Sequence, residues 1–384
     1  MCEEKGARFE SCPITKNKMK ILVAGHQFPD SFARNITVTL GRMGHQVTNV
    51  RGVRTRHHGG KLANAFWTYL PKAIPSLEKK LYHEVVQKAA SARPDLVLVT
   101  YGSMPPEVVS DLKRVCGGKI VCWYTDSAAG LNRNYLLASD FDFVFLKEPY
   151  LVSVGRDKLG LNALYLPECC NPIWHRPIHP DEQDLRKYGC DLAAQGTLHY
   201  YRARMLEAFA DYDLKIWGRN CPAWLDSRAK RNYSNRYVAE TEKAKALQSA
   251  KIIVNTMHFT EFEGVNCTLF EAAGCGAFQI ADWKPALPEL FEPEREIVTF
   301  RTRRELKEKV DYYLAHPVER REIAARACAR AHRDHTYEKR LQKMFEVMGL
   351  AKEGHEFSRS LSRRETLELS EEKGHEFTRA VTRI

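Results

Sequence analysis

The chain has 384 residues, of which 44% are hydrophobic and 28% are charged, values typical of a soluble globular protein. This length suffices for two domains of ordinary size, each with its own core. No run of about 18 apolar residues is present, which excludes a predicted membrane-spanning helix. Because residues 1–20 also lack the apolar stretch of a secretory signal, we expect a cytoplasmic protein.

The formal charge of +11 is compatible with a nucleic acid, an anionic lipid or a phosphorylated ligand as partner. Acidic residues are interleaved with the basic ones, notably in 301–309 and 319–333, as on solvated helix faces. We therefore expect no specific nucleic-acid partner and at most peripheral membrane contact. The sequence leaves the oligomeric state open.

The 11 cysteines form no Cys-x-x-Cys pair, and the adjacent Cys169 and Cys170 do not have a zinc-ligand spacing. An odd number scattered through apolar segments favours reduced, partly buried thiols. We expect no metal site and no bound cofactor.

The first half of the chain alternates short apolar runs with helical patterns. The runs predict strands at 20–24, 46–50, 96–99, 120–123, 143–146 and 163–166. The helical patterns lie at 31–44, 79–92 and 105–115. Fully apolar strands that alternate with helices predict a parallel sheet covered on both faces.

The composition changes at 167–180, which contains four prolines and shows no hydrophobic periodicity. This segment is therefore predicted to link two domains. The alternation then restarts. Strands are predicted at 191–194, 214–217, 252–255, 278–281 and 297–300. Helices are predicted at 200–211, at 239–249, from Asn266 onward, at 303–315 and at 318–333.

The predicted organisation therefore has six parts. They are a polar N-terminal extension (1–18), an N-terminal Rossmann-like domain (19–168), a linker (169–182), a C-terminal Rossmann-like domain (183–334), a closing helix (335–350) and a polar tail (351–384). The tail repeats Gly-His-Glu-Phe at an offset of 20 residues, and two copies are too few for a solenoid.

Residues 252–276 contain the pattern that is most informative about function. Two carboxylates, Glu263 and Glu271, are separated there by seven residues. If a helix starts between these acids, its amides and positive dipole end favour a pyrophosphate. Gly264 would let the backbone approach a ligand, and carboxylates suit the paired hydroxyls of a sugar. An ordinary surface helix with both glutamates in water fits the spacing equally well.

The sequence resembles a known family at this point. Glu263 and Glu271 resemble the two-glutamate signature of retaining GT-B glycosyltransferases. The wider motifs look like the spore maturation protein CgeB family: 270–278 followed by Asp282 and Trp283, 211–218, 312–317, and 335–337 with Arg340. The resemblance covers about 19–350. It implies an α/β GT-B fold, with two Rossmann-like, doubly wound parallel-sheet domains facing each other across a cleft.

In such enzymes the second glutamate holds the nucleotide ribose and the first contacts the donor sugar, here Glu271 and Glu263. The resemblance also matches Gly196 and Arg202 to a glycine loop and a following arginine that could face diphosphate. Arg202 as a simple helix-surface cation remains the alternative. The full candidate set for nucleotide-sugar binding is Gly196, Arg202, Gly218, Arg219, Asn255, Gly264, Val265, Asn266 and Glu271. Many family members carry arginine where this chain has Thr268, so another cation would have to replace it.

The first half would supply the acceptor side, because ligands of open parallel sheets lie at the carboxyl ends of strands. Asp126 and His26 follow two predicted strands and are the candidate bases, giving Glu263, Asp126 and His26 as the candidate catalytic set. The structural alternatives are a strand-end turn residue for Asp126 and a helix-capping or core-edge role for His26.

The resemblance implies transfer of a sugar from a nucleoside diphosphate donor to a hydroxyl-bearing acceptor such as a glycan, lipid or protein, in cell-surface or spore-coat polysaccharide assembly. It suggests retention of anomeric configuration. Two rival hypotheses remain: a non-catalytic protein that binds a sugar nucleotide or glycan in envelope assembly, and a basic α/β protein that binds nucleic acid.

Overall fold

The computed structural model describes residues 18–51, 70, 73–126, 135–219, 221, 223 and 227–350. The predicted tail at 351–384, and all but the last residue of the extension at 1–18, lie outside this set. The chain divides into two compact units, Met1–Lys343 and Met344–Ile384. Every contact discussed below lies within the first unit.

The first sheet has six strands in the order β2-β1-β3-β4-β5-β6, and all neighbouring pairs are parallel. The strands are β1 (Lys20–Ala24), β2 (Gln46–Val50), β3 (Leu96–Val99), β4 (Lys119–Tyr124), β5 (Phe143–Leu146) and β6 (Ala163–Tyr165). The helices are α1 (Phe32–Arg42), α3 (Pro75–Leu81), α4 (His83–Ala92), α5 (Pro106–Val115), α6 (Tyr135–Ala138) and α7 (Pro149–Ser153), with a π-helical turn at Val154–Lys158. The central strand β3 is buried along its whole length, as expected for a sheet covered on both faces.

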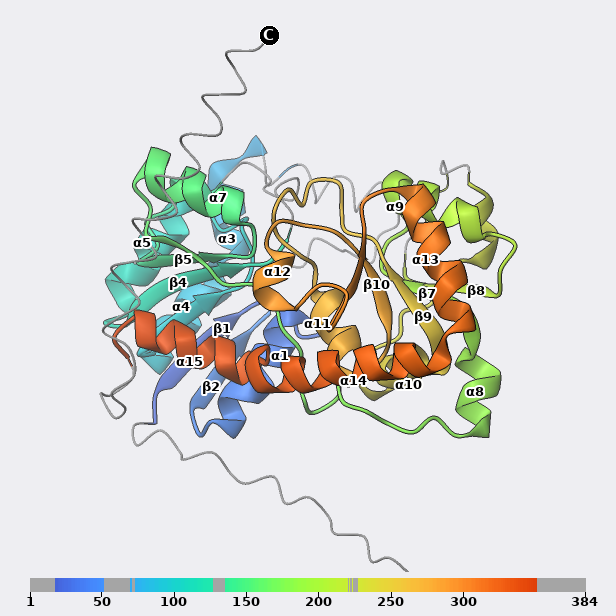
Figure 1. Cartoon of the computed structure of the whole chain (residues 1–384). Coiled ribbons are helices and arrows are strands. Elements are labelled where there is room, and N and C mark those ends of the chain that lie inside the picture. Colours follow the sequence, from blue (N-terminus) through green and yellow to red (C-terminus); the bar gives the residue numbers. More distant parts are fainter. Residues whose placement is uncertain are drawn as a thin grey trace, which may run out of the picture. The chain divides into compact units, whose positions relative to one another are not determined.

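The second sheet has five parallel strands in the order β11-β10-β9-β7-β8. Strands β7 to β10 are labelled in Figure 1. The strands are β7 (Cys190–Gln195), β8 (Leu214–Trp217), β9 (Ala250–Asn255), β10 (Gln279–Asp282) and β11 (Val298–Phe300). The helices are α8 (Glu182–Tyr188), α9 (Tyr200–Leu206), α10 (Glu240–Ser249), α11 (Cys267–Gly274), α12 (Leu287–Leu290), α13 (Arg303–Ala315), α14 (Pro317–Asp334) and α15 (Tyr337–Val347), with 3-10 turns at Glu207–Phe209 and Arg228–Asn232.

The prediction of two parallel α/β sheets is confirmed, with two local differences. The single helix expected at 79–92 is two helices that meet at Tyr82, which has non-helical backbone angles and donates its hydroxyl to the Ser103 carbonyl at 2.7 Å. The helix expected at 200–211 ends at Leu206 and continues as a 3-10 turn. In both places periodicity continues through a change of helix axis or type, which sequence spacing alone does not reveal.

The proline-rich segment between the sheets forms a single backbone bridge with the end of the second α/β region. The amide of Cys170 donates to the His335 carbonyl at 2.9 Å, and the amide of Tyr337 donates to the Cys170 carbonyl at 3.1 Å. The segment at 335–337 therefore has a structural role in joining these regions.

The nine cysteines of the described ranges are all free thiols. Burial raises the pKa of Cys122, Cys169 and Cys275 well above the ordinary thiol value, so these side chains stay protonated and act as small apolar groups. Within the described ranges, no helix is both long enough and apolar enough to cross a membrane.

Truncation of a core strand residue should lower stability strongly. Leu98 in β3 is fully buried, so Leu98→Ala should reduce the free energy of unfolding by about 2–5 kcal/mol through lost burial and a residual cavity. Leu185→Ala is the matched control, because Leu185 is 50% exposed. Urea denaturation measures both; equal effects of the two substitutions would contradict the assigned core.

Candidate functional site

The carboxyl ends of β7 and β9 bring Gly196 and Arg202 together. Gly196 has φ +105°, and a Cβ at this position would lie 2.6 Å from Nη1 of Arg202. The glycine therefore permits both the turn after β7 and the approach of the guanidinium. The two residues matched by the resemblance are neighbours in space as well.

Arg202 is a buried cation whose hydrogen-bond acceptors are all neutral. Its guanidinium donates to the Thr256 hydroxyl at 2.9 Å, the Thr256 carbonyl at 3.0 Å and the Thr197 carbonyl at 2.7 Å. Among the described residues, no carboxylate forms an ion pair with it. Burial lowers the pKa of Arg202, which remains charged nonetheless. The Glu261 carboxylate is close enough to oppose this lowering, although it does not bond to the guanidinium. A buried cation with no directly bonded carboxylate favours an anion at this site.

His199 lies beside this guanidinium at the start of α9. Its Nδ1 accepts the Arg202 amide at 3.4 Å, which leaves the proton on Nε2. Burial, the charge of Arg202 and that of His258 lower the pKa of His199 to about 4, so the ring is neutral near pH 7. Nε2 is buried and has no hydrogen-bond partner within the described ranges. It is an unused donor next to Arg202.

The N-terminus of α11 contributes further donors. The N-cap residue Asn266 accepts the Leu269 amide through its side chain at 3.2 Å, whereas the amides of Cys267 and Thr268 have no acceptor in the described part of the chain. Asn266 Nδ2 also approaches the Thr256 carbonyl at 3.5 Å, the same oxygen that Arg202 contacts. The helix end and the guanidinium are therefore adjacent.

Asn255 and Val265, both predicted to bind the ligand, have structural roles in this loop. Asn255 is buried, accepts from Asn266 Nδ2 at 2.8 Å and donates to Gln279 at 3.2 Å, so it anchors the N-cap of α11. Val265 is fully buried in an apolar cluster with Leu269. The side chain of Val265 thus packs in the core, and only its backbone is available to a ligand.

Gly218 and Arg219 follow β8. Gly218 lies against Gly196 and the Tyr233 hydroxyl, which is buried and has no partner among the described residues. Arg219 is exposed, with its guanidinium 5.1 Å from the centre of the Tyr237 ring. Gly218 therefore lies close to the Arg202 region, while Arg219 points to a more open surface.

Glu271 belongs to a buried group, here called the seam cluster, of Asp30, His175, Lys243 and Glu271. The Lys243 ammonium is 2.9 Å from Glu271 and also contacts Asp30, which follows β1 in the other sheet. Burial lowers the pKa of Lys243, but Glu271 and Asp30 raise it more, well above the ordinary value. Burial raises the pKa of Asp30, but Lys243 and His175 hold it well below its ordinary value.

His175 completes the cluster. Its Nδ1 accepts the Asn171 amide at 3.0 Å, so the proton is on Nε2, which is 3.2 Å from Asp30 and 4.0 Å from Glu271. Asp30, His175 and Glu271 offer ligand atoms within 4.8 Å of one another, a spacing compatible with a metal ion. The ammonium of Lys243 already supplies the positive charge there, and a second cation beside it would be repelled. The absence of a metal requirement stays a prediction.

Thr268 stands where many members of the resembled family carry arginine, and the structure shows which side chain it contacts. Gln195, the last residue of β7, donates to the Thr268 hydroxyl at 3.0 Å and to Glu271 at 3.1 Å. Two buried cations lie close to α11: Lys243, which is 2.9 Å from Glu271, and Arg202, which shares the Thr256 carbonyl with Asn266. The sequence does not single out Lys243, because it lies in a helix with several other charged residues and in no recognisable motif.

Glu263 and Gly264 lie in a loop held from the first sheet. The amides of Glu263 and Gly264 donate to the Glu148 carboxylate at 2.9 and 3.2 Å. A Cβ at Gly264 would collide with the Lys147 carbonyl, so the glycine makes room for protein backbone as well as for any ligand. The role of Gly264 toward a ligand stays a prediction. The Glu263 side chain is half-buried, and its carboxylate has no partner within the described ranges.

A second buried ion group lies beside this loop. Lys147 is 2.6 Å from Glu261 and 3.3 Å from Glu168. Burial raises the pKa of Glu168 to about 7 against the lowering effect of Lys147, and the neighbouring Glu261 and Asp126 carboxylates raise it further. Glu168 therefore exchanges its proton near neutral pH, a property that its sequence context does not indicate.

The two candidate bases lie at strand ends as predicted and are both exposed. Asp126 follows β4 and is close enough to Glu168 and Tyr124 to raise the pKa of each. His26 follows β1; its carbonyl accepts the Ser31 hydroxyl at 2.6 Å and its ring is 6.2 Å from that of Phe28. Neither side chain has a hydrogen-bond partner in the described part of the chain, and their catalytic roles stay predictions.

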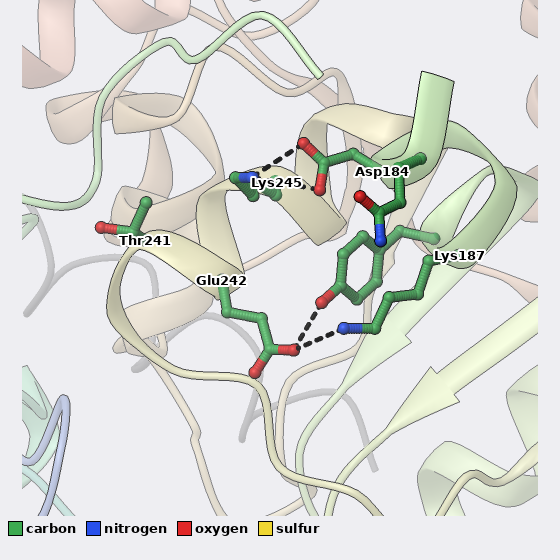
Figure 2. A pocket seen from close by; sticks show the side chains of 7 residues that line it. Asp184, Lys187, Thr241, Glu242 and Lys245 are labelled. Carbon is green, nitrogen blue, oxygen red and sulfur yellow. Dashed lines mark hydrogen bonds and ion pairs between the residues drawn. The ribbon is translucent and has the colours of Figure 1, made fainter. Parts of the chain in front are cut away.

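A shallow hollow between α8 and α10 is separate from these groups (Figure 2). Its charged side chains are paired with one another: Lys245 with Asp184 at 2.9 Å, and Lys187 with Glu242 at 3.4 Å. Glu242 and Lys245 occupy one face of α10, whereas Lys243 faces the seam cluster. Because its charges are mutually satisfied, the hollow is a weaker candidate for an anionic ligand.

Part of the chain is similar to a known protein family. Residues 202–346, from within α9 to within α15, match the family described as glycosyl transferase-like. Comparison with curated proteins finds no match.

Solved structures are similar over most of the chain. Sucrose-phosphate synthase from Thermosynechococcus elongatus has 15% identity and a TM-score of 0.61, with 86% of this chain and 98% of that chain covered. HepE from Anabaena in complex with UDP-glucose has 13% identity and a TM-score of 0.60, with 86% and 99% covered. The UDP-forming α,α-trehalose-phosphate synthase from Burkholderia vietnamiensis has 12% identity and a TM-score of 0.58, with 87% and 98% covered.

The fold is thus that of the GT-B glycosyltransferases, with two parallel-sheet α/β domains. Residues 202–346 are glycosyl transferase-like in sequence as well.

Loss of the seam cation should unfold the protein more easily. Lys243→Met leaves Asp30 and Glu271 buried without their counter-charge, so the free energy of unfolding should fall by about 3–5 kcal/mol. Lys251→Met, at a residue whose side chain is 56% exposed and pairs with Asp191, should cost less than about 1 kcal/mol. Denaturant titration measures both; a small effect at Lys243 would show that the cluster is not held by this charge.

The raised pKa of Glu168 makes stability depend on pH. Because the folded chain holds this proton up to about pH 7 and the unfolded chain releases it near 4.5, the wild type should lose stability as pH rises between these values. Glu168→Gln cannot ionise. Its free energy of unfolding relative to the wild type should therefore rise by up to about 3 kcal/mol across this window. Glu182→Gln, at an exposed side chain, is the control; a pH-independent difference for Glu168→Gln would contradict the assignment.

Proposed function

We propose that this protein is a glycosyltransferase that transfers a sugar from a nucleoside diphosphate donor to a hydroxyl-bearing acceptor. The observation that carries the proposal is the buried Arg202 guanidinium, which has only neutral acceptors around it. A diphosphate is the counter-charge that would satisfy it, and a guanidinium recognises phosphate oxygens well.

The surrounding donors support a diphosphate in particular. The unused Nε2–H of His199 and the free amides at the start of α11 add neutral donors beside Arg202. As the bond between sugar and phosphate breaks, negative charge develops on the leaving diphosphate. Fixed donors and a buried cation would stabilise that charge without a metal ion, which is the contribution we assign to this chain.

The two acids would hold the sugars of the donor. Glu271 accepts from Lys243 and Gln195, and a carboxylate has lone pairs left for ribose hydroxyls. Glu263 has an unpartnered carboxylate on the neighbouring loop and would contact the transferred sugar. HepE, whose fold is similar, binds UDP-glucose, which makes a uridine donor the first to test.

The finer features rest on the resemblance. We propose membership of the CgeB-like group, retention of anomeric configuration and a glycan-type acceptor in envelope or coat assembly, with Asp126 or His26 close to the acceptor. Proton NMR of the product determines the anomeric configuration.

Nucleotide binding tests the role of Arg202. A panel of UDP-, GDP-, ADP- and dTDP-sugars should contain at least one that raises the melting temperature of the wild type, because a ligand stabilises the folded state that binds it. Arg202→Met should weaken binding of that donor roughly 10- to 100-fold through loss of charged hydrogen bonds. Arg202→Lys, which keeps the charge and loses the planar fork, should give an intermediate loss.

The matched control is Arg204→Met on the same helix. The Arg204 side chain is 75% exposed and pairs with Glu207, so its removal should leave binding unchanged. Equal donor affinity in Arg202→Met and the wild type would refute the proposed site, as would the absence of any thermal shift across the panel.

A non-catalytic sugar-nucleotide-binding protein is the second candidate, because both candidate bases are exposed and unpartnered. Such a protein would bind the donor and release no nucleoside diphosphate over hours in the presence of acceptors. A coupled assay for the released diphosphate separates the two.

A further inference from the structure

The loop that carries Glu263 is fixed by a carboxylate from the other sheet. Glu148, two residues after the end of β5, is 2% exposed. Its carboxylate accepts the amides of Phe262 at 3.1 Å, Glu263 at 2.9 Å and Gly264 at 3.2 Å. Three successive amides on one carboxylate form a concave anion-binding arrangement that is already filled.

The preceding residue holds the same loop with the opposite charge. The Lys147 ammonium is 2.6 Å from Glu261, and its carbonyl packs against Gly264. The Glu261 side chain in turn accepts the His258 amide at 2.7 Å. Lys147 and Glu148, here called the loop clamp, therefore fix residues 261–264 through side chains and backbone together.

The clamp leaves one group of the loop unused. The backbone of Glu263 is held on both sides, because its amide donates to Glu148 and its carbonyl accepts the Ala286 amide at 3.0 Å. Its carboxylate has no partner within the described ranges. A fixed backbone with an unpartnered acidic side chain is the arrangement expected of a residue held ready for a ligand.

We propose that Glu148 is a positioning residue for the sugar half of the donor site. It touches no substrate itself and acts by fixing the backbone of Glu263. The role rests on the proposed function and deepens it: recognition of the transferred sugar depends on the first sheet through Glu148, whereas recognition of the diphosphate depends on Arg202 in the second.

A competing role for Glu148, as an internal occupant that a ligand displaces, is disfavoured by packing. Gly264 is pressed against the backbone of Lys147, so the amides cannot open to a ligand without separating the two segments. The two roles give opposite signs in a binding experiment.

Calorimetric titration of UDP-glucose and UDP, or of the corresponding pair that gives the largest shift in the panel above, separates sugar from diphosphate recognition. Glu148→Ala should weaken binding of the nucleotide-sugar about tenfold or more and that of the bare diphosphate less than about threefold. Glu148→Gln keeps one carbonyl acceptor and should recover part of the loss. Asp157→Asn, at an exposed acid on the turn after α7, should match the wild type.

Hydrogen exchange gives a second readout that needs no ligand. The amides of residues 262–264 should exchange faster in Glu148→Ala and Glu148→Gln, while those in the middle of α11 remain protected. Unchanged exchange in this loop, tighter binding of the nucleotide-sugar, or equal loss for nucleotide-sugar and diphosphate would each overturn the positioning role. Failure of every pair to bind the wild type would instead overturn the proposed function, and this role with it.

Discussion

The sharing of one buried ammonium between two carboxylates is the constraint on which the rest of the structure depends. Lys243 lies between Asp30, which follows a strand of the first sheet, and Glu271, which belongs to a helix of the second. Since none of these charges can be left unpaired in the interior, the elements that carry them must remain together. His175, from the connecting segment, lies in the same group, with its Nε2 3.2 Å from Asp30. The placement of Glu271 therefore follows from a contact between segments of the two sheets.

The electrostatics of the molecule divide into two kinds of region. In the seam cluster a lysine and two acids neutralise one another, and in the loop clamp Lys147 pairs with Glu261 while Glu148 accepts backbone amides; these contacts fix geometry. Around Arg202 the hydrogen-bond acceptors are carbonyl and hydroxyl oxygens, and no carboxylate of the described ranges bonds to the guanidinium. The seam cluster and the loop clamp hold the framework together. A negatively charged ligand would gain most electrostatic stabilisation beside Arg202. The hollow between α8 and α10, although concave, belongs to the first kind (Figure 2).

The sheets were predictable because short apolar strands and alternating helices follow from local periodicity, and because β7, β8 and β9 all start within two residues of their predicted positions. The proximity of Gly196 to Arg202 could also be predicted, because the two residues lie in one strand–loop–helix pattern. Asp30, Lys243 and Glu148 were not, because their roles arise from contacts between segments more than 100 residues apart. Sequence spacing says nothing about which distant carboxylate reaches an amide. The side chain of Val265 packs in the core, which its position before the helix does not reveal, and a binding role of its backbone stays a prediction.

The contact of Lys147 with Gly264 also constrains the order in which the chain can acquire its final form. Residues 261–264 take up their geometry against a backbone segment that precedes them by more than 110 residues, so this loop is completed only after the end of β5 is in place. Synthesis from the N-terminus produces the first sheet earlier, and domains generally fold as they emerge. The first sheet thus serves as a template for the folding of residues 261–264. A substitution that destabilises the first sheet should therefore also disturb this loop, which is distant in the sequence.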